Sequence, residues 1–331
     1  MACKSPKYRK SAGSVVACGQ CTPCLLKRKR EKCSRVLLES KANGLLDTLF
    51  VTLTYDNAHL PTLCVRQELL PGEDRKRSVV YQCPTGTLDP DHPVKFLKLL
   101  RYYMSKEGMT LRDVYVGEYG DKNKRPHYHF ILWGLPYNRR ELIYKSWVHK
   151  KIPMCSPQRI DVQIPKSERH IAQYLTAYIL QGKRRKGAAV LNGAYPEFYR
   201  TSKGLGLQYA NGVAKALSTP SGLANLWIDG KLPSSFFFDG KNYPLDRYMK
   251  GKIYERLSSV LQEELPKAAL TAFKEEMYLV YEDALLDEAF AQRVMNLPLE
   301  KAMEEAVRLK NAARATQIEK KHSFFTTKKG D

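Results

Sequence analysis

No apolar stretch of this 331-residue chain approaches the length of a membrane span. The first ten residues are polar and basic, so the apolar segment of a secretory signal peptide is missing as well. Both absences predict a protein of the cytosol, where disulfide bonds are not expected. The eight cysteines of the chain therefore need another explanation.

The chain also lacks a G-x-x-x-x-G-K-S/T phosphate-binding loop. The pair Gly182-Lys183 has neither the preceding glycine nor the following serine or threonine of that motif. ATP-driven unwinding of nucleic acid is therefore not expected from this protein by itself.

Acidic residues are in the minority, because 34 Asp and Glu face 55 Lys and Arg and leave a net charge of +21. Residues 1–40 hold ten bases and two acids, whereas residues 262–308 hold eleven acids and five bases. A basic excess makes a phosphate backbone an attractive ligand, although a run of charge can also be a solvated surface. The composition therefore favours a nucleic-acid partner without proving one.

Three of the cysteines, Cys18, Cys21 and Cys24, form a C-x2-C-x2-C run, and Cys3 is the nearest fourth thiol. Four thiolates are common tetrahedral ligands of structural Zn²⁺, so we predict a small zinc knuckle near the N-terminus. Two alternatives stay open, Cys33 as the fourth ligand or no metal at all, because a knuckle normally uses two separated cysteine pairs.

A basic helix is predicted directly after the cysteine run, ending at about Ser40. It opens with four candidate DNA-binding residues, Lys27, Arg28, Lys29 and Arg30. Charges in this arrangement could follow a phosphate backbone.

Residues 118–129 read Glu-Tyr-Gly-Asp-Lys-Asn-Lys-Arg-Pro-His-Tyr-His. Alternate side chains of a strand share a face, so His127 and His129 point the same way while Tyr128 points into the opposite layer. The Gly, Asp, Asn and Pro residues between predict a hairpin turn that returns Glu118 toward the histidines. These three side chains could bind one divalent ion, and their mixed nitrogen and oxygen set suits Mn²⁺ or Mg²⁺. The alternative is that the histidines are ordinary core or surface groups.

A second constellation lies at 167–182, where a Ser167 cap, an acidic first turn and Gly182 predict one helix. Tyr174 and Tyr178 are four residues apart, so one helical turn places both phenols on the same face. A basic run follows directly, Lys183, Arg184, Arg185 and Lys186. Such a tyrosine pair can be core packing, but beside basic residues it indicates nucleophiles next to a phosphate-binding patch.

The remaining patterns predict an α+β fold. We expect strands at 48–55, 112–118, 127–134 and 158–164, helices at 93–107 and 139–149, and a loop with one short hairpin in the insertion 57–92. This order, β-α-β-β-α-β followed by the tyrosine helix, is the split-βαβ layout of ferredoxin-like folds, with one antiparallel sheet.

Composition divides the chain into four parts. These are a Cys-rich basic segment at 1–45, a core at 46–186, a Gly- and aromatic-rich lobe at 187–250, and an acidic helical region at 251–331. In the last part we expect helices from 251, at about 267–292 and from Leu299 to about Glu319. The aromatic residues of the lobe, which include Phe236, Phe237 and Phe238, could stack on DNA bases or form a small core.

The sequence resembles the HUH endonucleases, in particular the replication initiators of small single-stranded DNA phages of the microvirus group. The resemblance depends on Phe50-Val-Thr-Leu-Thr-Tyr55, Arg125-Pro-His-Tyr-His129 and Tyr174-Leu-Thr-Ala-Tyr178. Cys18-Gly-Gln-Cys-Thr-Pro-Cys24 and Ser202-Lys-Gly-Leu-Gly-Leu207 are similar to further signatures of that group. It covers roughly residues 3 to 250.

The resemblance implies a replication initiation endonuclease with an HUH core. Glu118, His127 and His129 would hold the metal ion while Tyr174 or Tyr178 attacks the origin strand. The products would be a 5′-phosphotyrosyl enzyme and a 3′-OH that primes rolling-circle replication, and the strand is later rejoined. The family usually has a lysine between its tyrosines where this chain has Ala177, and Lys183 is the candidate replacement.

The same resemblance implies the partners. These are a single-stranded origin, a helicase and a polymerase of the bacterial host, and the host cytoplasm is the expected location. Candidate DNA contacts beyond the first helix are Arg125, Arg184, Arg185 and Lys186. Two other functions stay open, an HUH relaxase or transposase and a non-catalytic zinc-knuckle protein that binds single-stranded DNA.

Overall fold

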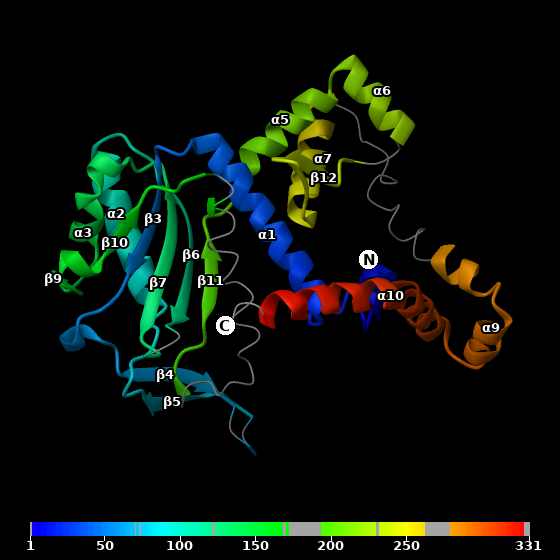
Figure 1. Cartoon of the computed structure of the whole chain (residues 1–331), viewed down its shortest axis with the longest axis horizontal. Coiled ribbons are helices and arrows are strands. Elements are labelled where there is room, and N and C mark those ends of the chain that lie inside the picture. The colour runs from blue at the N-terminus through cyan, green and yellow to red at the C-terminus, as the bar shows by residue number, and fades with distance from the viewer. Residues whose placement is uncertain are drawn as a thin grey trace. The chain divides into compact units, whose positions relative to one another are not determined.

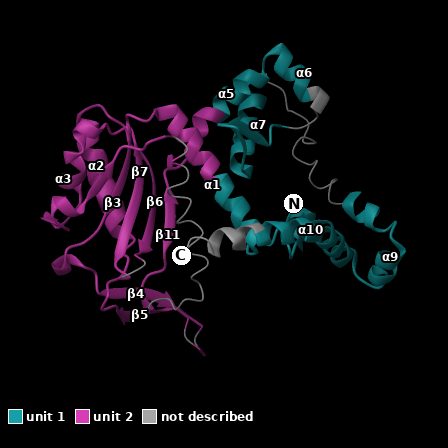
Figure 2. Ribbon diagram, viewed as in Figure 1, with its two compact units in different colours: residues 1–31, 210–331 teal, residues 32–209 magenta. Residues whose placement is uncertain are grey.

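The computed structural model describes residues 2–69, 71–72, 74–120, 123–167, 170–171, 193–229, 232–261 and 279–327. The chain forms two compact units (Figure 2). One comprises residues 1–31 and 210–331, and the other comprises residues 32–209. None of the described helices is long and apolar enough to cross a membrane. The four-part division expected from composition stays a prediction.

A five-stranded antiparallel sheet forms the centre of unit 32–209 (Figure 1). Its order is β10 (Asp161–Gln163), β3 (Thr48–Leu53), β7 (Pro126–Trp133), β6 (Arg112–Tyr119) and β11 (Phe198–Thr201). Helix α2 (Asp91–Lys106) connects β3 to β6, and β7 lies between these two strands. The α+β class, the antiparallel sheet and the four expected strands are confirmed, whereas β11 was not expected.

One face of the sheet is covered by α2 and by α3 (Glu141–Ser146). The apolar residues of α2 recur at helical spacing, so Phe96, Leu100 and Met104 all reach the core. Gly108 follows this helix in the left-handed conformation with φ 71°, which a side chain would disfavour, and the helix ends there.

Helix α3 is shorter than the predicted span 139–149. Trp147 turns inward after it, where its Nε1 donates to the carbonyl oxygen of Thr54 at 2.7 Å. The chain then forms a short ribbon, β8 (Val148–His149) and β9 (Ile152–Pro153). The expected helix is wrong in this half because burial of the indole ring outweighs the local helical pattern.

The opposite face is covered in part by the second half of α1 (Thr22–Asn43), which begins earlier than predicted and includes Cys24. Val36 of α1 packs with Val114, Ile131 and Trp133 of the sheet and with Leu205. This contact lies toward the end of β7 at Trp133, so the beginning of β7 on the same face is left for other residues.

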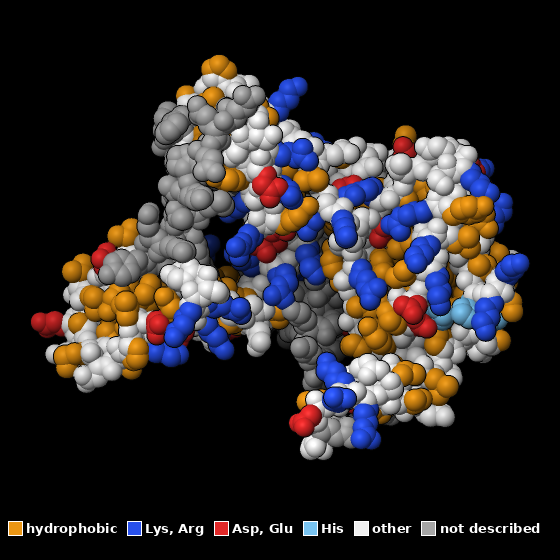
Figure 3. All heavy atoms as spheres, turned by 180° about the vertical axis from the view of Figure 1, so that it is seen from behind, with side chains coloured by type: hydrophobic (Ala, Val, Ile, Leu, Met, Phe, Trp, Pro, Cys, Tyr) orange, Lys and Arg blue, Asp and Glu red, His pale blue; other side chains and the backbone are white. Residues whose placement is uncertain are grey.

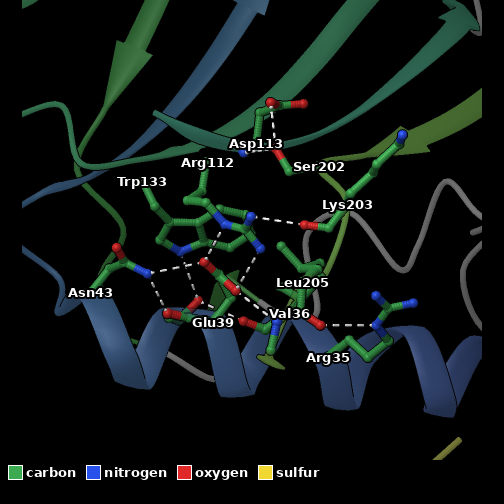
Figure 4. Close-up of polar contacts among 12 residues, drawn as sticks. Arg35, Val36, Glu39, Asn43, Arg112, Asp113, Trp133, Ser202, Lys203 and Leu205 are labelled. Carbon is green, nitrogen blue, oxygen red and sulfur yellow. Dashed lines mark hydrogen bonds and ion pairs between the residues drawn. The ribbon is translucent and has the colours of Figure 1, made fainter. Parts of the chain in front are cut away.

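The carboxylate of Glu39 joins three separate segments on this face (Figure 4). It is 3% exposed and accepts from Arg112 Nε at 2.9 Å and from the backbone N–H of Gly206 at 2.7 Å. Arg112 Nη1 in turn donates to the carbonyl oxygen of Lys203 at 2.8 Å. The glycine-rich segment after β11 is thereby bound to both α1 and β6.

The insertion 57–92 contains the expected hairpin, β4 (Leu63–Glu68) paired with β5 (Arg77–Gln82). Its inner face reaches the core through Cys64, and Tyr81 donates to Glu68 at 2.7 Å. Single 3-10 turns lie at Lys10–Ala12, Asn57–His59, Tyr137–Arg139 and Pro157–Arg159.

In the other unit the acidic helix α10 (Leu299–Thr327) packs on a hairpin made by β1 (Lys7–Arg9) and β2 (Ser14–Val16). Val15 of the hairpin contacts Met303 and Val307 of the helix in one buried cluster. Lys4 Nζ pairs with Glu319 at 2.7 Å. The acidic C-terminal region therefore packs against the basic N-terminal segment, as a packing element of this unit. Helix α10 begins where predicted, at Leu299.

The rest of this unit contains two helices, a hairpin and a third helix. They are α5 (Leu207–Leu217), α6 (Pro220–Asp229), β12 (Ser235–Phe238), β13 (Lys241–Pro244) and α7 (Arg247–Leu261). Helix α9 (Glu288–Val294) precedes α10, and most of the expected helix 267–292 lies outside the described residues.

We expect Glu39→Ala to lower the free energy of unfolding by about 3 kcal/mol, because the change leaves a guanidinium and a buried N–H without their acceptor. Urea denaturation followed by tryptophan fluorescence measures this effect. The matched control is Glu107→Ala, which removes the ion pair of Glu107 with Arg139, two groups that are each more than a third exposed. The control should cost less than about 1 kcal/mol. Equal costs for the two variants would contradict the role given to Glu39.

Candidate active site

The predicted ligands meet near the beginning of β7 because of the register between three strands. Glu118 of β6 is paired with His127 of β7, and Val116 is paired with His129. The side chains of Glu118, His127 and His129 therefore share one face of the sheet. His129 Nε2 lies 2.9 Å from Glu118 Oε1, so an imidazole and a carboxylate are in direct contact.

The other neighbour of His129 is Thr52 of β3, its partner in the sheet. Thr52 Oγ1 lies 3.1 Å from His129 Nδ1. With one ring nitrogen at a hydroxyl and the other at a carboxylate, the 9% exposed imidazole is held in one orientation. Thr52 is a site residue that the sequence analysis did not identify, since only the pairing of β3 with β7 reveals it.

His127 is half-buried beside His129, and the two ring planes are 16° apart with centroids separated by 6.3 Å. Its Nδ1 is buried and has no hydrogen-bond partner within the part of the chain that the structure describes. Burial, and then the neighbouring His129, lower the pKa of His127 below its usual value. At neutral pH the ring is therefore uncharged, which is the form that binds metal ions.

Gly120 gives this ring its room. A Cβ atom at Gly120 would lie 3.0 Å from Cε1 of His127, which is closer than ordinary contact. The predicted turn residue thus has a second role, because any larger residue would press on the imidazole. The two imidazoles and the carboxylate could together bind one divalent cation.

The opposite face of β7 is held by Tyr128, which is fully buried as predicted. Its hydroxyl accepts from the backbone N–H of Asp89 at 2.8 Å and lies 2.8 Å from the hydroxyl of Tyr55. Tyr55 also contacts His92 Nδ1 at 2.8 Å. These bonds fix the inward face of the strand, so the two histidines are fixed on the outward face.

The tyrosine pair and its basic run lie outside the described residues, as do Lys183, Arg184, Arg185 and Lys186. The structure does describe how their helix begins. Ser167 Oγ accepts from the backbone N–H of His170 at 3.1 Å, so the predicted cap is confirmed. Ile171 is fully buried against Phe50 in the cluster on the histidine face of the sheet.

Arg125, a candidate DNA contact, lies in the turn before β7. Its Nη2 donates to the carbonyl oxygen of Tyr55 at 3.0 Å and its Nη1 to Asn57 Oδ1 at 2.8 Å. This arginine therefore joins the turn to the loop after β3. Many other Lys and Arg side chains lie on the face shown in Figure 3.

The four predicted zinc ligands come together in unit 1–31 with 210–331. Their sulfur atoms, from Cys3, Cys18, Cys21 and Cys24, all lie within 4.8 Å of one another. Cys21 Sγ is 3.4 Å from Cys24 Sγ and 3.9 Å from Cys3 Sγ, and Cys18 Sγ is 4.0 Å from Cys24 Sγ. A tetrahedral zinc site with Zn–S bonds of about 2.3 Å requires sulfur separations of about 3.8 Å. The cluster therefore fits zinc, and Cys33 does not belong to it.

The charge state of Cys18 agrees with a ligand role. Burial opposes its ionisation, but the backbone N–H groups of Gln20 and Cys21 and the thiols of Cys3 and Cys21 outweigh burial and lower its pKa to about 6. A thiolate, rather than a thiol, binds metal. In contrast, burial raises the pKa of Cys3 and of Cys24, so a cation would be needed to ionise all four groups.

Residues 48–183 match a family model of replication-associated proteins that is described by the name ORF2. The chain is 31% identical over 201 residues to the replication-associated protein ORF2 of Spiroplasma virus 4, which covers 59% of this chain and 56% of that protein. It is 32% identical over 130 residues to the replication-associated protein VP4 of Bdellovibrio phage phiMH2K, covering 39% and 35% of the two chains. A third relative is the replication-associated protein ORF4 of Chlamydia phage 1, with 31% identity over 118 residues, 35% of this chain and 23% of that protein.

The expected resemblance to microvirus-like replication proteins is confirmed by these matches. The match spans about half the length or less of the curated relatives. No solved structure matches this chain. The matched segment 48–183 contains the Thr52, Glu118, His127 and His129 side chains and extends through the tyrosine pair.

We expect purified protein to contain about one Zn²⁺ per chain, because four converging thiols make a closed site. Mass spectrometry of the metal content measures the stoichiometry. Cys21→Ser should contain much less zinc, since Cys21 contacts two other sulfurs of the cluster. Cys33→Ser is the matched control and should keep the metal. Zinc content that depends on Cys33, or that is unchanged in Cys21→Ser, would contradict the assignment.

Proposed function

We propose that this protein initiates replication of a single-stranded DNA phage genome as an HUH-type endonuclease that nicks the origin strand. The observation that carries the proposal is the line of contacts from Thr52 through His129 to Glu118, with His127 on the same face. This site lies in the segment that matches replication-associated proteins. The strand order with β7 inserted between β3 and β6 supports an HUH core.

Glu118, His127 and His129 would hold a divalent ion, Mn²⁺ or Mg²⁺. When bound, the ion withdraws negative charge from the scissile phosphodiester and lowers the barrier to nucleophilic attack. Thr52 keeps the His129 ring in place through its Nδ1, so Nε2 faces the metal position beside Glu118. The uncharged His127 ring offers a second nitrogen from the same face.

Tyr174 and Tyr178 are the proposed nucleophiles. In an α-helix, residues three and seven positions after Ile171 lie on the same face as Ile171, which packs on the histidine face of the sheet. A continued helix would therefore direct both phenols toward the metal position. A free phenol with a pKa of about 10 is only about 0.1% ionised at pH 7, so the site must assist its deprotonation.

The proposed reaction exchanges one ester bond for another. The phenolate oxygen forms a bond to phosphorus while the bond from phosphorus to the 3′ oxygen breaks, and that oxygen takes up a proton. The result is a 5′-phosphotyrosyl enzyme and a free 3′-OH that can prime synthesis. Attack of a 3′-OH on the phosphotyrosine reverses the step and rejoins the strand, and the second tyrosine allows a second cut.

Basic residues would hold the DNA while the site acts. Arg125 lies at the turn next to the histidines, and the exposed or half-buried part of α1 carries Lys27, Arg28, Lys29 and Arg30. The basic run 183–186, with Lys183 replacing the lysine that Ala177 displaces, would contact the phosphates beside the tyrosines. A helicase and a polymerase of the host would supply unwinding and synthesis, because the sequence has no ATP-binding loop.

One other function is favoured by a specific observation. The cysteine cluster fits a zinc knuckle, so a non-catalytic single-strand binder would explain the cysteines and the charge. It would leave the contacts of His129 with Thr52 and Glu118 without a role. An HUH relaxase or transposase would use the same chemistry on other DNA.

The first test is a covalent adduct. Incubation with a labelled origin strand and Mn²⁺ should give a protein–DNA adduct that survives denaturation, and mass spectrometry should locate it on Tyr174 or Tyr178. Tyr174→Phe and Tyr178→Phe should each retain some single-round nicking, because one phenol remains. The double variant should bind DNA without forming the adduct. We expect Tyr178 to act first because it lies nearer the basic run. DNA linked to any other residue would overturn this mechanism.

The second test concerns the metal position. Thr52→Val keeps the branched side chain but removes the hydroxyl, so Mn²⁺ affinity and nicking should fall about 10- to 100-fold. Thr52→Ser keeps the hydroxyl and should stay close to the unmodified protein. Electron paramagnetic resonance of unbound Mn²⁺ measures the affinity. His127→Ala and His129→Ala should abolish nicking while DNA affinity changes only a few-fold. Full-rate cleavage by either histidine variant would reject the ligand assignment.

A further inference from the structure

The hairpin β12–β13 in unit 1–31 with 210–331 separates the three consecutive phenylalanines. Asp239 and Gly240 form its two-residue turn with φ values of 46° and 70°, the left-handed pair of a tight hairpin. The turn fixes the register, in which Phe236 is opposite Tyr243 and Phe237 is opposite Asn242. Neighbouring residues of a strand must then point to opposite faces.

The inner face of this hairpin is an aromatic stack. The rings of Phe236 and Tyr243 are 5.6 Å apart and nearly parallel at 22°, and Phe236 is only 9% exposed. Phe238 meets Tyr243 edge-on at 6.3 Å. This stack accounts for two of the three phenylalanines as packing residues, and it stiffens the ribbon that carries the third.

Phe237 lies on the outer face and is 71% exposed. Burial of a phenylalanine side chain is worth about 1.5 to 3 kcal/mol, so exposure of the ring forgoes that stabilisation. The fixed register leaves no alternative, because a slip by one residue would expose Phe236 and Phe238 instead. A rigid ribbon therefore presents one flat aromatic ring.

Basic residues surround this ring. Arg30 Nη2 on α1 donates to the carbonyl oxygen of Asn242, directly opposite Phe237, at 3.1 Å. Lys241 begins β13, and its backbone is paired with that of Phe238. Residues 22–31 and 232–252 together hold eight Lys and Arg and three Asp and Glu. The surroundings of the exposed ring thus favour a polyanion.

We infer that this hairpin is a second contact for single-stranded DNA, in which a base stacks on Phe237 while Arg30 and Lys241 contact the neighbouring phosphates. An unpaired strand exposes both the flat faces of its bases and its phosphates, and the combination of one ring with adjacent cations matches it. A protein partner would be better served by a contiguous apolar patch, whereas this face offers one ring among charged groups.

This inference goes beyond the proposed function, since the hairpin lies outside residues 48–183 and takes no part in cleavage. It also concerns a different property, the affinity for a strand of any sequence. The surface would keep hold of a single strand independently of the nicking reaction.

The test is equilibrium binding of a fluorescent oligothymidylate to the full chain, measured by anisotropy without added Mn²⁺ or Mg²⁺ over a series of salt concentrations. Phe237→Ala should weaken binding about 5- to 150-fold, which corresponds to about 1 to 3 kcal/mol for one stacked base. Its salt dependence should be unchanged, because the lost contact carries no charge. Phe237→Trp retains an aromatic face and should bind like the unmodified protein.

Arg30→Gln should behave differently, with a log–log salt slope that is shallower by about 0.7 because one phosphate contact is lost. Leu286→Ala is the matched control, since Leu286 is an 85% exposed apolar residue of the same unit. Unchanged affinity in Phe237→Ala would overturn the inference, and so would an equal loss in Phe237→Trp. A changed oligomeric state with unchanged DNA affinity would assign the ring to a protein contact instead.

The result is separate from the fate of the proposed function. The binding assay requires neither metal nor cleavage, so a missing phosphotyrosyl adduct would reject the nicking mechanism and leave the binding result standing. Conversely, an adduct formed by a protein in which Phe237 has no effect on binding would reject only the hairpin contact.

Discussion

The insertion of β7 between β3 and β6 is the constraint on which the candidate site depends. In this arrangement His129 has Thr52 on one side and Val116 on the other, and Glu118 comes within 2.9 Å of its Nε2. A slip of one residue would turn both histidines into the opposite layer and expose Tyr128. The chemistry of the site is therefore a consequence of strand register more than of any single side chain.

Buried polar groups on both faces of the sheet maintain that register. On the inner face, the hydroxyl of Tyr128 is bonded to the backbone of Asp89 and lies beside that of Tyr55. On the outer face, Glu39 binds Arg112 at the start of β6 and holds the segment that follows β11. Removing one partner from such a group leaves an unsatisfied charge or dipole, so each is bound strongly to one arrangement.

Local patterns in the sequence were sufficient for much of the fold. Helix α2, the start of α10 and the strands β3, β6 and β7 were predicted from periodicity, and each has that structure. The predictions were less accurate where distant contacts compete with local preference. Trp147 ends α3 early because its ring is buried against Thr54, and β11 exists as a strand because β6 offers it an edge.

The sequence by itself determined which residues carry chemistry. The spacing of two places His127 and His129 on one face of any strand, and the cysteine run brings three thiols together within one helical turn and its approach. Only the tertiary structure decided that Thr52 orients His129, that Cys3 rather than Cys33 completes the cluster, and that Phe237 is exposed. The reason is physical: side-chain direction follows from the local backbone, whereas a partner far away in the chain is set by sheet pairing and packing.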